Sequence, residues 1–225
     1  MQSSHAPFWI VIGDLHGRTD RLSAIPGVTS AEGILITGDL TTAGGAAAAR
    51  RVLDGVAAFN PTTLSLFGNM DKPDVAVCLR EAGIDLHRTV RRLDADTAVL
   101  GIGGSTPTPF GTPSEFSEAD IARWLDELLI QARDCSRLVL VSHTPPLGTA
   151  CDRTAGGLHA GSEAVREFIV KHQPDVCLCG HIHESSAEDR LGRTRVINPG
   201  ALGDGGYAVL SLGNTLDVSR HVAGI

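Results

Sequence analysis

Short apolar runs alternate with longer amphipathic stretches along most of the chain. Each apolar run ends near Gly, Pro or a polar side chain, as buried strands do, and the runs cover residues 8–12, 34–37, 63–67, 97–102, 138–142 and 176–179. The stretches between them have helical character and cover residues 46–59, 73–82, 118–132 and 162–172. Strands that alternate with helices predict a layered α/β fold.

The hydrophobic pattern changes after Glu184. Apolar positions there alternate with polar ones and are separated by Gly or Asn, as in antiparallel hairpins, in the segments 187–191, 194–197, 207–212 and 215–218. No linker or internal repeat interrupts the sequence. Because a chain of 225 residues can bury a large core, we expect one domain over residues 1–225.

Composition narrows the class of protein. A hydrophobic content of 42% and a charged content of 20% are ordinary for a soluble globular domain. The 19 Lys and Arg residues against 26 Asp and Glu residues leave a formal net charge of −7, which disfavours nucleic acid or an anionic membrane as a partner. The chain has no basic leader, and its first apolar run is too short for a signal-peptide core or a membrane span. We therefore predict a cytoplasmic protein.

The cysteines indicate a reducing environment as well. They are five in number and scattered, which is typical of free thiols rather than of a disulfide framework. Cys177 and Cys179 fall at the end of a predicted strand. We expect both to be buried and inert, with their side chains on opposite faces of the strand.

Polar side chains with metal-binding capacity follow the ends of several predicted strands. In chain order they are Asp14, His16, Asp39, Asn69, His143, His181 and His183. Ligands in open α/β sheets bind just beyond the carboxyl ends of the strands, so this placement predicts a shared site. Two cations about 3.5–4 Å apart can hold a nucleophile and a phosphoryl group together. The residue types and their order therefore predict a two-metal site for phosphate-ester hydrolysis.

Each short motif is weaker evidence when taken alone. A Gly-Asp pair such as Gly38-Asp39 is most often a turn, because Gly supplies positive φ and Asp bonds the local backbone. Gly180-His181-Ile182-His183 is more informative, since alternate histidines beside Gly are unusual as packing elements. The prediction of a two-metal site therefore rests on these motifs occurring together and in this order.

The five ligand-bearing blocks together resemble the calcineurin-like metallophosphoesterase superfamily. They are Gly-Asp-Leu-His-Gly from residue 13, Gly-Asp from 38, Gly-Asn-Met-Asp from 68, Ser-His from 142 and Gly-His-Ile-His from 180. The resemblance extends over nearly the full chain. It implies a four-layer α/β/β/α sandwich, in which two mixed β-sheets are flanked by helices and a dinuclear site lies at their edge.

The same resemblance implies a role for every candidate ligand. Asp14, His16 and His183 would bind one metal ion. Asn69, His143 and His181 would bind the other, and Asp39 would bridge both. We expect manganese, while Fe, Ni, Co and Zn suit the same mixed ligands. Compact relatives frequently form dimers, so a homodimer is also compatible with the resemblance.

The charges of this ligand set suit phosphate chemistry. Two divalent ions bring about four positive charges, and the two carboxylates of Asp14 and Asp39 remove about two of them. The surplus can bind a phosphate group and lower the pKa of a bridging water. We therefore expect a metal-bridging hydroxide to attack phosphorus in line.

One position departs from the family pattern. Many members carry His after the Asn of the third block, where it protonates the leaving oxygen or contacts the phosphate, whereas this chain has Met70. A thioether cannot donate that proton. We predict His159, in the long connection 144–161, as the replacement acid, the alternative being a surface or loop-packing histidine. Asp71 is predicted to orient a neighbouring group of the site, the alternative being a turn cap before Pro73.

The sequence thus favours a metal-dependent phosphoesterase that prefers phosphodiesters of small substrates. The diester preference rests on Met70 and on the resemblance to compact members that carry Gly-Asn-x-Asp. A phosphomonoesterase of small substrates is the closest alternative. A scaffold that binds metal without catalysis is the alternative from another class, although the complete ligand set argues against it.

Overall fold

Two mixed β-sheets form the centre of the computed structural model, which describes residues 6–224. The first sheet has the strand order β11-β10-β1-β2-β3 and consists of β1 (Phe8–Ile12), β2 (Gly33–Ile36), β3 (Thr63–Ser65), β10 (Gly206–Leu212) and β11 (Leu216–Val222). The second has the order β4-β5-β6-β7-β9-β8 and consists of β4 (Val90–Arg92), β5 (Thr97–Ile102), β6 (Arg137–Ser142), β7 (Val176–Leu178), β8 (Ala187–Leu191) and β9 (Thr194–Asn198).

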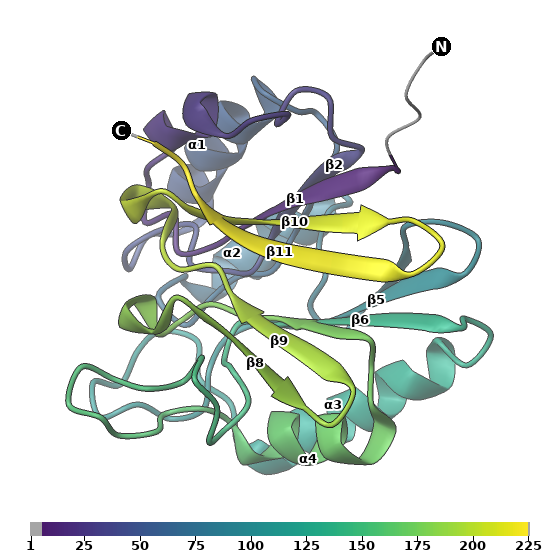
Figure 1. Ribbon diagram of the computed structural model, residues 1–225. Helices are drawn as coiled ribbons and strands as arrows, with labels where there is room; N and C mark the ends of the chain where they lie inside the picture. The colour runs from purple at the N-terminus through teal and green to yellow at the C-terminus, as the bar shows by residue number, and fades with distance from the viewer. Residues whose placement is uncertain (1–5, 225) are drawn as a thin grey trace.

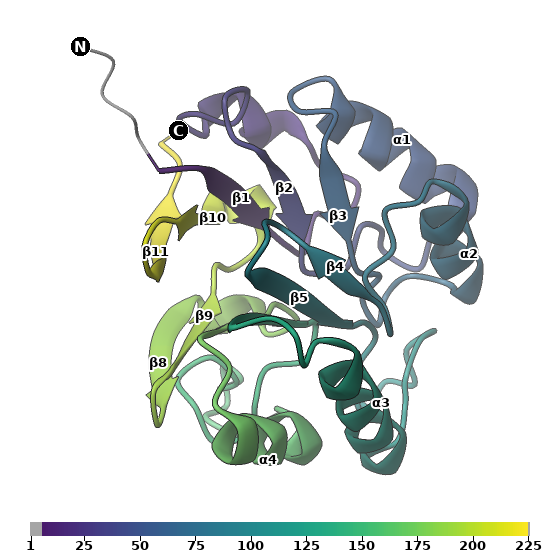
Figure 2. The same cartoon turned by 90° about the vertical axis from the view of Figure 1, so that its right-hand side faces the viewer.

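The four α-helices of the described residues cover the outer faces of the two sheets (Figures 1 and 2). Helices α1 (Ala46–Ala57) and α2 (Pro73–Glu81) pack on the first sheet, and α3 (Glu118–Gln131) and α4 (Glu163–His172) pack on the second. A buried cluster lies between each sheet and its helices, and a third lies between the two sheets. The expected four-layer α/β/β/α sandwich is confirmed.

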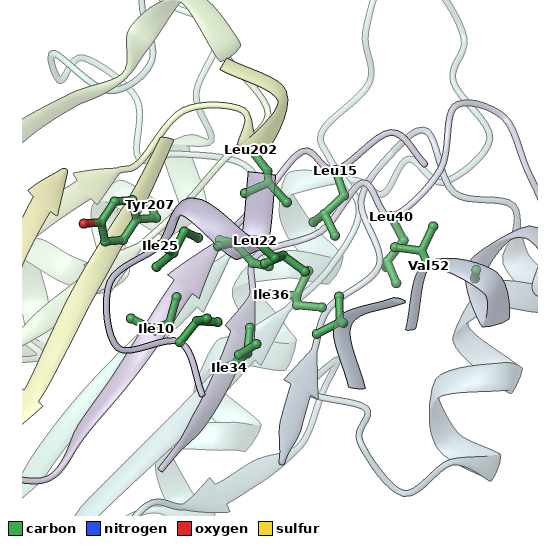
Figure 3. Packing of buried hydrophobic residues seen from close by; sticks show 14 of the residues in the cluster. Ile10, Leu15, Leu22, Ile25, Ile34, Ile36, Leu40, Val52, Leu202 and Tyr207 are labelled. Carbon is green, nitrogen blue, oxygen red and sulfur yellow. The ribbon is translucent and has the colours of Figure 1, made fainter. Parts of the chain in front are cut away.

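The continuous apolar run of β1 is explained by cores on both of its faces. Ile10 and Ile12 belong to the buried cluster on the outer, helix-bearing side of the first sheet, part of which is drawn in Figure 3. Trp9 and Val11 alternate with them and point to the second sheet. Because successive side chains of a strand face opposite sides, a strand with two buried faces must be apolar at every position.

The parallel strands bring the predicted ligand loops to one edge of the sandwich. In the first sheet β1, β2 and β3 run parallel, and in the second β5, β6, β7 and β9 do. Their carboxyl ends therefore point the same way within each sheet. The loops that follow β1, β2, β3, β6 and β7 carry the candidate ligands.

The predicted elements agree with the structure to within about four residues at each end. The strand predicted at 63–67 ends at Ser65, and the one predicted at 215–218 continues to Val222. The short strand β4 and the 3-10 helix Asp20–Ala24 were not predicted. The two expected hairpins form, and β8-β9 joins the second sheet while β10-β11 joins the first. Within the described residues, no helix combines the length and the apolar character that a membrane crossing needs.

The expectation for the cysteine pair was wrong in one respect. Cys177 and Cys179 are free and fully buried, as predicted, but both side chains belong to the cluster under α3 and α4. Residues two apart in an extended segment share a face, so opposite orientations were not to be expected. Burial raises the pKa of both thiols, which keeps them protonated.

Candidate metal centre

The structure brings all seven candidate ligands together at the edge where the strands end. Five of them border a cavity of about 990 Å³, namely His16, Asp39, Asn69, His181 and His183. Asp14 and His143 lie behind these five and are buried, with 1% and 0% of their surface exposed. Segments up to 167 positions apart in the sequence therefore meet at this site.

Asp14, His16, Asp39 and His183 form the first group. One donor atom of each lies within 4.8 Å of the donor atoms of the others. The His16 Nε2 atom is 3.1 Å from His183 Nε2 and 3.8 Å from Asp39 Oδ2. His183 Nε2 is also 3.5 Å from Asp14 Oδ1.

Asp39, Asn69, His143 and His181 form the second group. The Oδ1 atom of Asn69 lies 3.0 Å from His143 Nε2 and 2.8 Å from His181 Nδ1. His143 Nε2 is also 3.5 Å from Asp39 Oδ1. Asp39 thus presents Oδ2 to the first group and Oδ1 to the second, so that its carboxylate lies between them.

These separations suit coordination by metal ions. Ligand atoms bound at about 2.1 Å and at angles between square and tetrahedral lie about 3.0–3.4 Å from one another. The contacts within both groups cluster around that range. Two imidazole nitrogens at 3.1 Å would repel each other as lone pairs, and either a proton or a cation between them removes the repulsion. The donor set is therefore suited to two divalent cations.

Neighbouring groups fix the ring orientation of two histidines. The Nδ1 atom of His16 lies 3.0 Å from Thr42 Oγ1, and that of His143 lies 3.0 Å from the carbonyl oxygen of Thr37. These contacts turn the Nε2 atom of each ring toward the centre. Such outer contacts set the tautomer and orientation of metal-binding histidines.

The electrostatics of the cluster attract positive charge. Burial opposes protonation of His143, but the charge and hydrogen bond of Asp39, the charge of Asp14 and the Thr37 carbonyl together outweigh it and raise the pKa of this histidine to about 9. Burial, assisted by the charge of His143, lowers the pKa of His181 to about 4. The cluster thus holds positive charge next to its carboxylates, at a place that bound cations can take over.

The backbone of the ligand loops is strained. Asp14, His16, Asp39 and His181 have φ values of 50°, 47°, 50° and 71°, and they are four of the seven non-glycine residues with positive φ in the described part of the chain. Such conformations cost about 1–3 kcal/mol each and concentrate at functional sites. The tight packing also requires Gly68, where any Cβ atom would overlap the Asp39 carboxylate.

Asp71 is fully buried outside the cavity and joins two ligand loops. Its Oδ2 accepts hydrogen bonds from the backbone N–H groups of Leu40 (3.0 Å) and Gly68 (2.9 Å). Its Oδ1 accepts from the backbone N–H (2.8 Å) and the hydroxyl (2.7 Å) of Thr41. Lys72, and not Asp71, occupies the N-cap position of α2. Asp71 therefore connects the loop of Asp39 to the loop of Asn69.

His159 borders the same cavity, on the loop that follows β6. Its Nδ1 lies 2.6 Å from Oδ1 of Asp152, which is fully buried. The Asp152 carboxylate also accepts backbone hydrogen bonds from Gly148, Thr149 and Gly161. The pair is thereby held in place, and the other ring nitrogen of His159 is left without a protein partner in the described residues.

Sequence reasoning missed several residues that support the site. Asp152 stands in no recognisable motif, since its pairing with His159 arises only from the folded loop. Thr42 gave no signal either. Asn198, the last residue of β9, is buried and its side-chain amide donates to the carbonyl oxygen of Ile182 at 2.9 Å. Arg18, which follows the first ligand block, forms an exposed ion pair with Asp20 and does not line the cavity.

Comparison with known proteins agrees with this geometry. Residues 116–219 match the model of a metallophosphoesterase family of the calcineurin superfamily. The uncharacterized protein MJ1162 of Methanocaldococcus jannaschii is 32% identical over 198 residues, which are 84% of this chain and 85% of that protein. The 3',5'-cyclic adenosine monophosphate phosphodiesterase CpdA of Escherichia coli K12 is 30% identical over 182 residues. That match covers 74% of this chain and 59% of CpdA, less than two thirds of its length.

Solved structures share the fold. The protein TT1561 of Thermus thermophilus superposes with a TM-score of 0.70 at 20% identity, over 96% of this chain and 99% of that one. A dimetal phosphatase from Danio rerio gives a TM-score of 0.67 at 14% identity, over 98% and 100% of the two chains. The sequence match, the fold and the His/Asp cluster lead to one conclusion: this chain belongs to the calcineurin-like metallophosphoesterase superfamily of metal-dependent hydrolases.

Proposed function

We propose that this protein hydrolyses phosphodiesters with two divalent metal ions. The observation that carries the proposal is the pair of donor groups that share Asp39 beside one cavity. Asp14, His16 and His183 would hold one ion, Asn69, His143 and His181 the other, and Asp39 would bridge them. When bound, such ions neutralise the phosphate charge and make water nucleophilic near neutral pH.

The residues of the chain prepare this site in three ways. Asp14 and Asp39 supply the negative charge that attracts cations to a buried position. Thr42 and the Thr37 carbonyl turn His16 and His143 toward the centre. The strained loops fix these donors before any substrate arrives, and preorganised charge is a large source of catalysis.

The cavity favours diesters over monoesters. None of the described residues that line it is Lys or Arg, and Glu184 contributes an acidic group. A phosphomonoester carries a charge of about −1.5 to −2 at neutral pH, whereas a diester carries only about −1. A site without basic side chains suits the smaller charge. The similarity to CpdA, a cyclic nucleotide phosphodiesterase by name, points to the same substrate class.

His159 would protonate the leaving oxygen, which Met70 cannot do because a thioether carries no transferable proton. The imidazole faces the cavity, and the buried Asp152 carboxylate holds its Nδ1 side. An acid oriented by a carboxylate keeps one ring nitrogen directed at the substrate. Asp71 would act at a distance from the substrate, as a positioning residue for Asp39 and Asn69.

A metal screen tests the function itself. We expect the chelator-treated protein to be inactive, and Mn or another divalent ion to restore hydrolysis of bis-nitrophenyl phosphate at a higher rate than nitrophenyl phosphate. Cyclic nucleotides extend the test to natural diesters. Faster cleavage of the monoester would favour the phosphomonoesterase alternative. No hydrolysis with any metal would favour the scaffold alternative.

Asp39→Asn tests the shared carboxylate. The change removes one negative charge from both groups of donors, so we expect metal content to fall below two ions per chain and the rate of hydrolysis to fall at least about 100-fold. Metal content is measured by mass spectrometry after gel filtration. Asp134→Asn changes an exposed carboxylate and serves as the control. Unchanged stoichiometry and rate would remove the bridging assignment.

His159→Ala tests the proton donor. A positioned general acid contributes about 10²–10⁴-fold, and it matters most when the leaving oxygen is strongly basic. We expect the variant to lose at least about 100-fold on a phenyl diester and much less on the matching nitrophenyl diester. The measurement is kcat on the paired esters at constant metal saturation. Equal losses on both esters would exclude His159 as the acid.

Asp71→Asn tests the connection between the two ligand loops. An amide offers one acceptor oxygen and places an NH2 group against backbone N–H donors, so at least one buried donor loses its partner. We expect a loss of about 1–3 kcal/mol in urea unfolding of the metal-free protein, and a roughly 10–100-fold weaker metal affinity. Asp96→Asn, at an exposed position, is the control. An unfolding midpoint and a metal affinity equal to wild type would contradict the positioning role.

A further inference from the structure

Two highly exposed apolar side chains border the cavity beside the candidate metal centre. Phe110 is 87% exposed and Leu158 is 74% exposed, and these are the highest values among the large hydrophobic residues of the described chain. Both line the cavity, although they come from different loops. Phe110 lies in the loop after β5, and Leu158 in the loop after β6. Large apolar groups left in water beside an active centre commonly mark a binding surface.

The loop that carries Phe110 is braced rather than free. Glu115 accepts hydrogen bonds from the Thr108 hydroxyl (2.7 Å), the Thr112 backbone N–H (2.7 Å) and the Thr112 hydroxyl (2.6 Å). The segment also contains three prolines, which restrict its backbone, at positions 107, 109 and 113. The Phe110 ring is therefore presented to the cavity by a preordered loop. The side chain is exposed because the braced loop holds it there.

The loop that carries Leu158 is held by a compact turn. Thr154 and Leu158 exchange hydrogen bonds, since the Thr154 backbone N–H donates to the Leu158 carbonyl at 2.9 Å and the Leu158 N–H donates to the Thr154 hydroxyl at 3.2 Å. The Ala155 N–H donates to Glu184 at 2.8 Å, which ties the turn to the segment beside His183. The apolar side chain is thus positioned relative to the candidate metal ligands.

We propose that Phe110 and Leu158 bind a flat, uncharged apolar substituent of the phosphodiester, such as an aromatic ring. This inference rests on the proposed function for the phosphate end of the substrate. Ring stacking on Phe110 and burial against Leu158 remove apolar surface from water, which favours binding. A further anionic group is disfavoured because Glu184 would repel it and no Lys or Arg of the described cavity lining would attract it, while the apolar side chains of Phe110 and Leu158 favour an uncharged group.

A second property of the cavity supports this assignment. Thr106, Pro107, Pro109, Pro113 and Met70 line the same cavity as Phe110 and the candidate ligands. These side chains offer little hydrogen-bonding specificity for a sugar or a peptide. Recognition on this side therefore depends on shape and apolar contact, with the phosphate as the only charged anchor.

Binding of two diester analogues that cannot be hydrolysed tests the inference without any turnover. Diphenylphosphinate and dimethylphosphinate have P–C bonds in place of the ester bonds, carry the same charge and differ in their substituents. With metal-reconstituted protein, we expect calorimetry and competition to show diphenylphosphinate binding at least about tenfold more tightly. Phe110→Ala and Leu158→Ala should each weaken binding of diphenylphosphinate about three- to tenfold and leave binding of dimethylphosphinate nearly unchanged. Ile130→Ala, which removes an exposed apolar side chain from α3, is the matched control.

The outcomes separate this inference from the proposed function. Equal affinity for the two phosphinates, or wild-type affinity for diphenylphosphinate in both cavity variants, would overturn the apolar site even if diesters are hydrolysed. A retained aromatic preference in a protein that hydrolyses no ester would support the site and reject the function. Because both side chains are exposed, thermal unfolding of the variants should match wild type, which excludes misfolding as the cause of a loss.

Discussion

Buried negative charge at the junction of two sheets is the constraint on which the rest of the site depends. Asp14, Asp39 and Asp71 are at most 2% exposed and lie on neighbouring strand ends. A carboxylate in such a place is costly unless hydrogen bonds or cations compensate it. Asp71 is satisfied by the loop backbone it binds. Asp14 and Asp39 are surrounded by imidazoles, which can accept protons or share cations, and a metal centre follows from that arrangement.

The sandwich holds these charges in place because its strands are anchored on both faces. Strand β1 places alternate residues in the helix-facing and the inter-sheet cores, so the loop that begins after Ile12 starts from a fixed point. That rigidity sustains positive φ at Asp14, His16 and Asp39. A loop on a less constrained strand would relax to ordinary backbone angles and separate the donors. Burial of the strands therefore allows the strained backbone of the ligand loops to persist.

Much of this architecture was accessible from the sequence, for identifiable reasons. Runs such as 8–12 and 97–102 are apolar at nearly every position, which indicates doubly buried strands, and polar residues placed directly after such strands converge at one edge. Strand β4 escaped prediction because it has only three residues, two of them Arg. The Asp152–His159 pair and the Glu115 brace also escaped, since contacts within irregular loops leave no periodic pattern. That Phe110 and Leu158 border one cavity follows only from how their two loops fold.

The candidate metal ligands come from the strand ends, whereas the proposed acid and the apolar side chains come from longer loops. This separation is compatible with Met70, which carries no transferable proton, in one of the ligand turns. The ligands come from tight turns after strands, where a Cβ atom at Gly68 would already overlap Asp39, so these positions admit little variation. His159, Phe110 and Leu158 come from loops that are braced internally and contact the centre only across the cavity. The proposed proton donor His159 is thus supplied by a loop and not by a ligand turn, so its placement leaves the buried carboxylates of Asp14 and Asp39 untouched. On this proposal the loops determine leaving-group chemistry and substrate choice, while the strand ends determine metal binding.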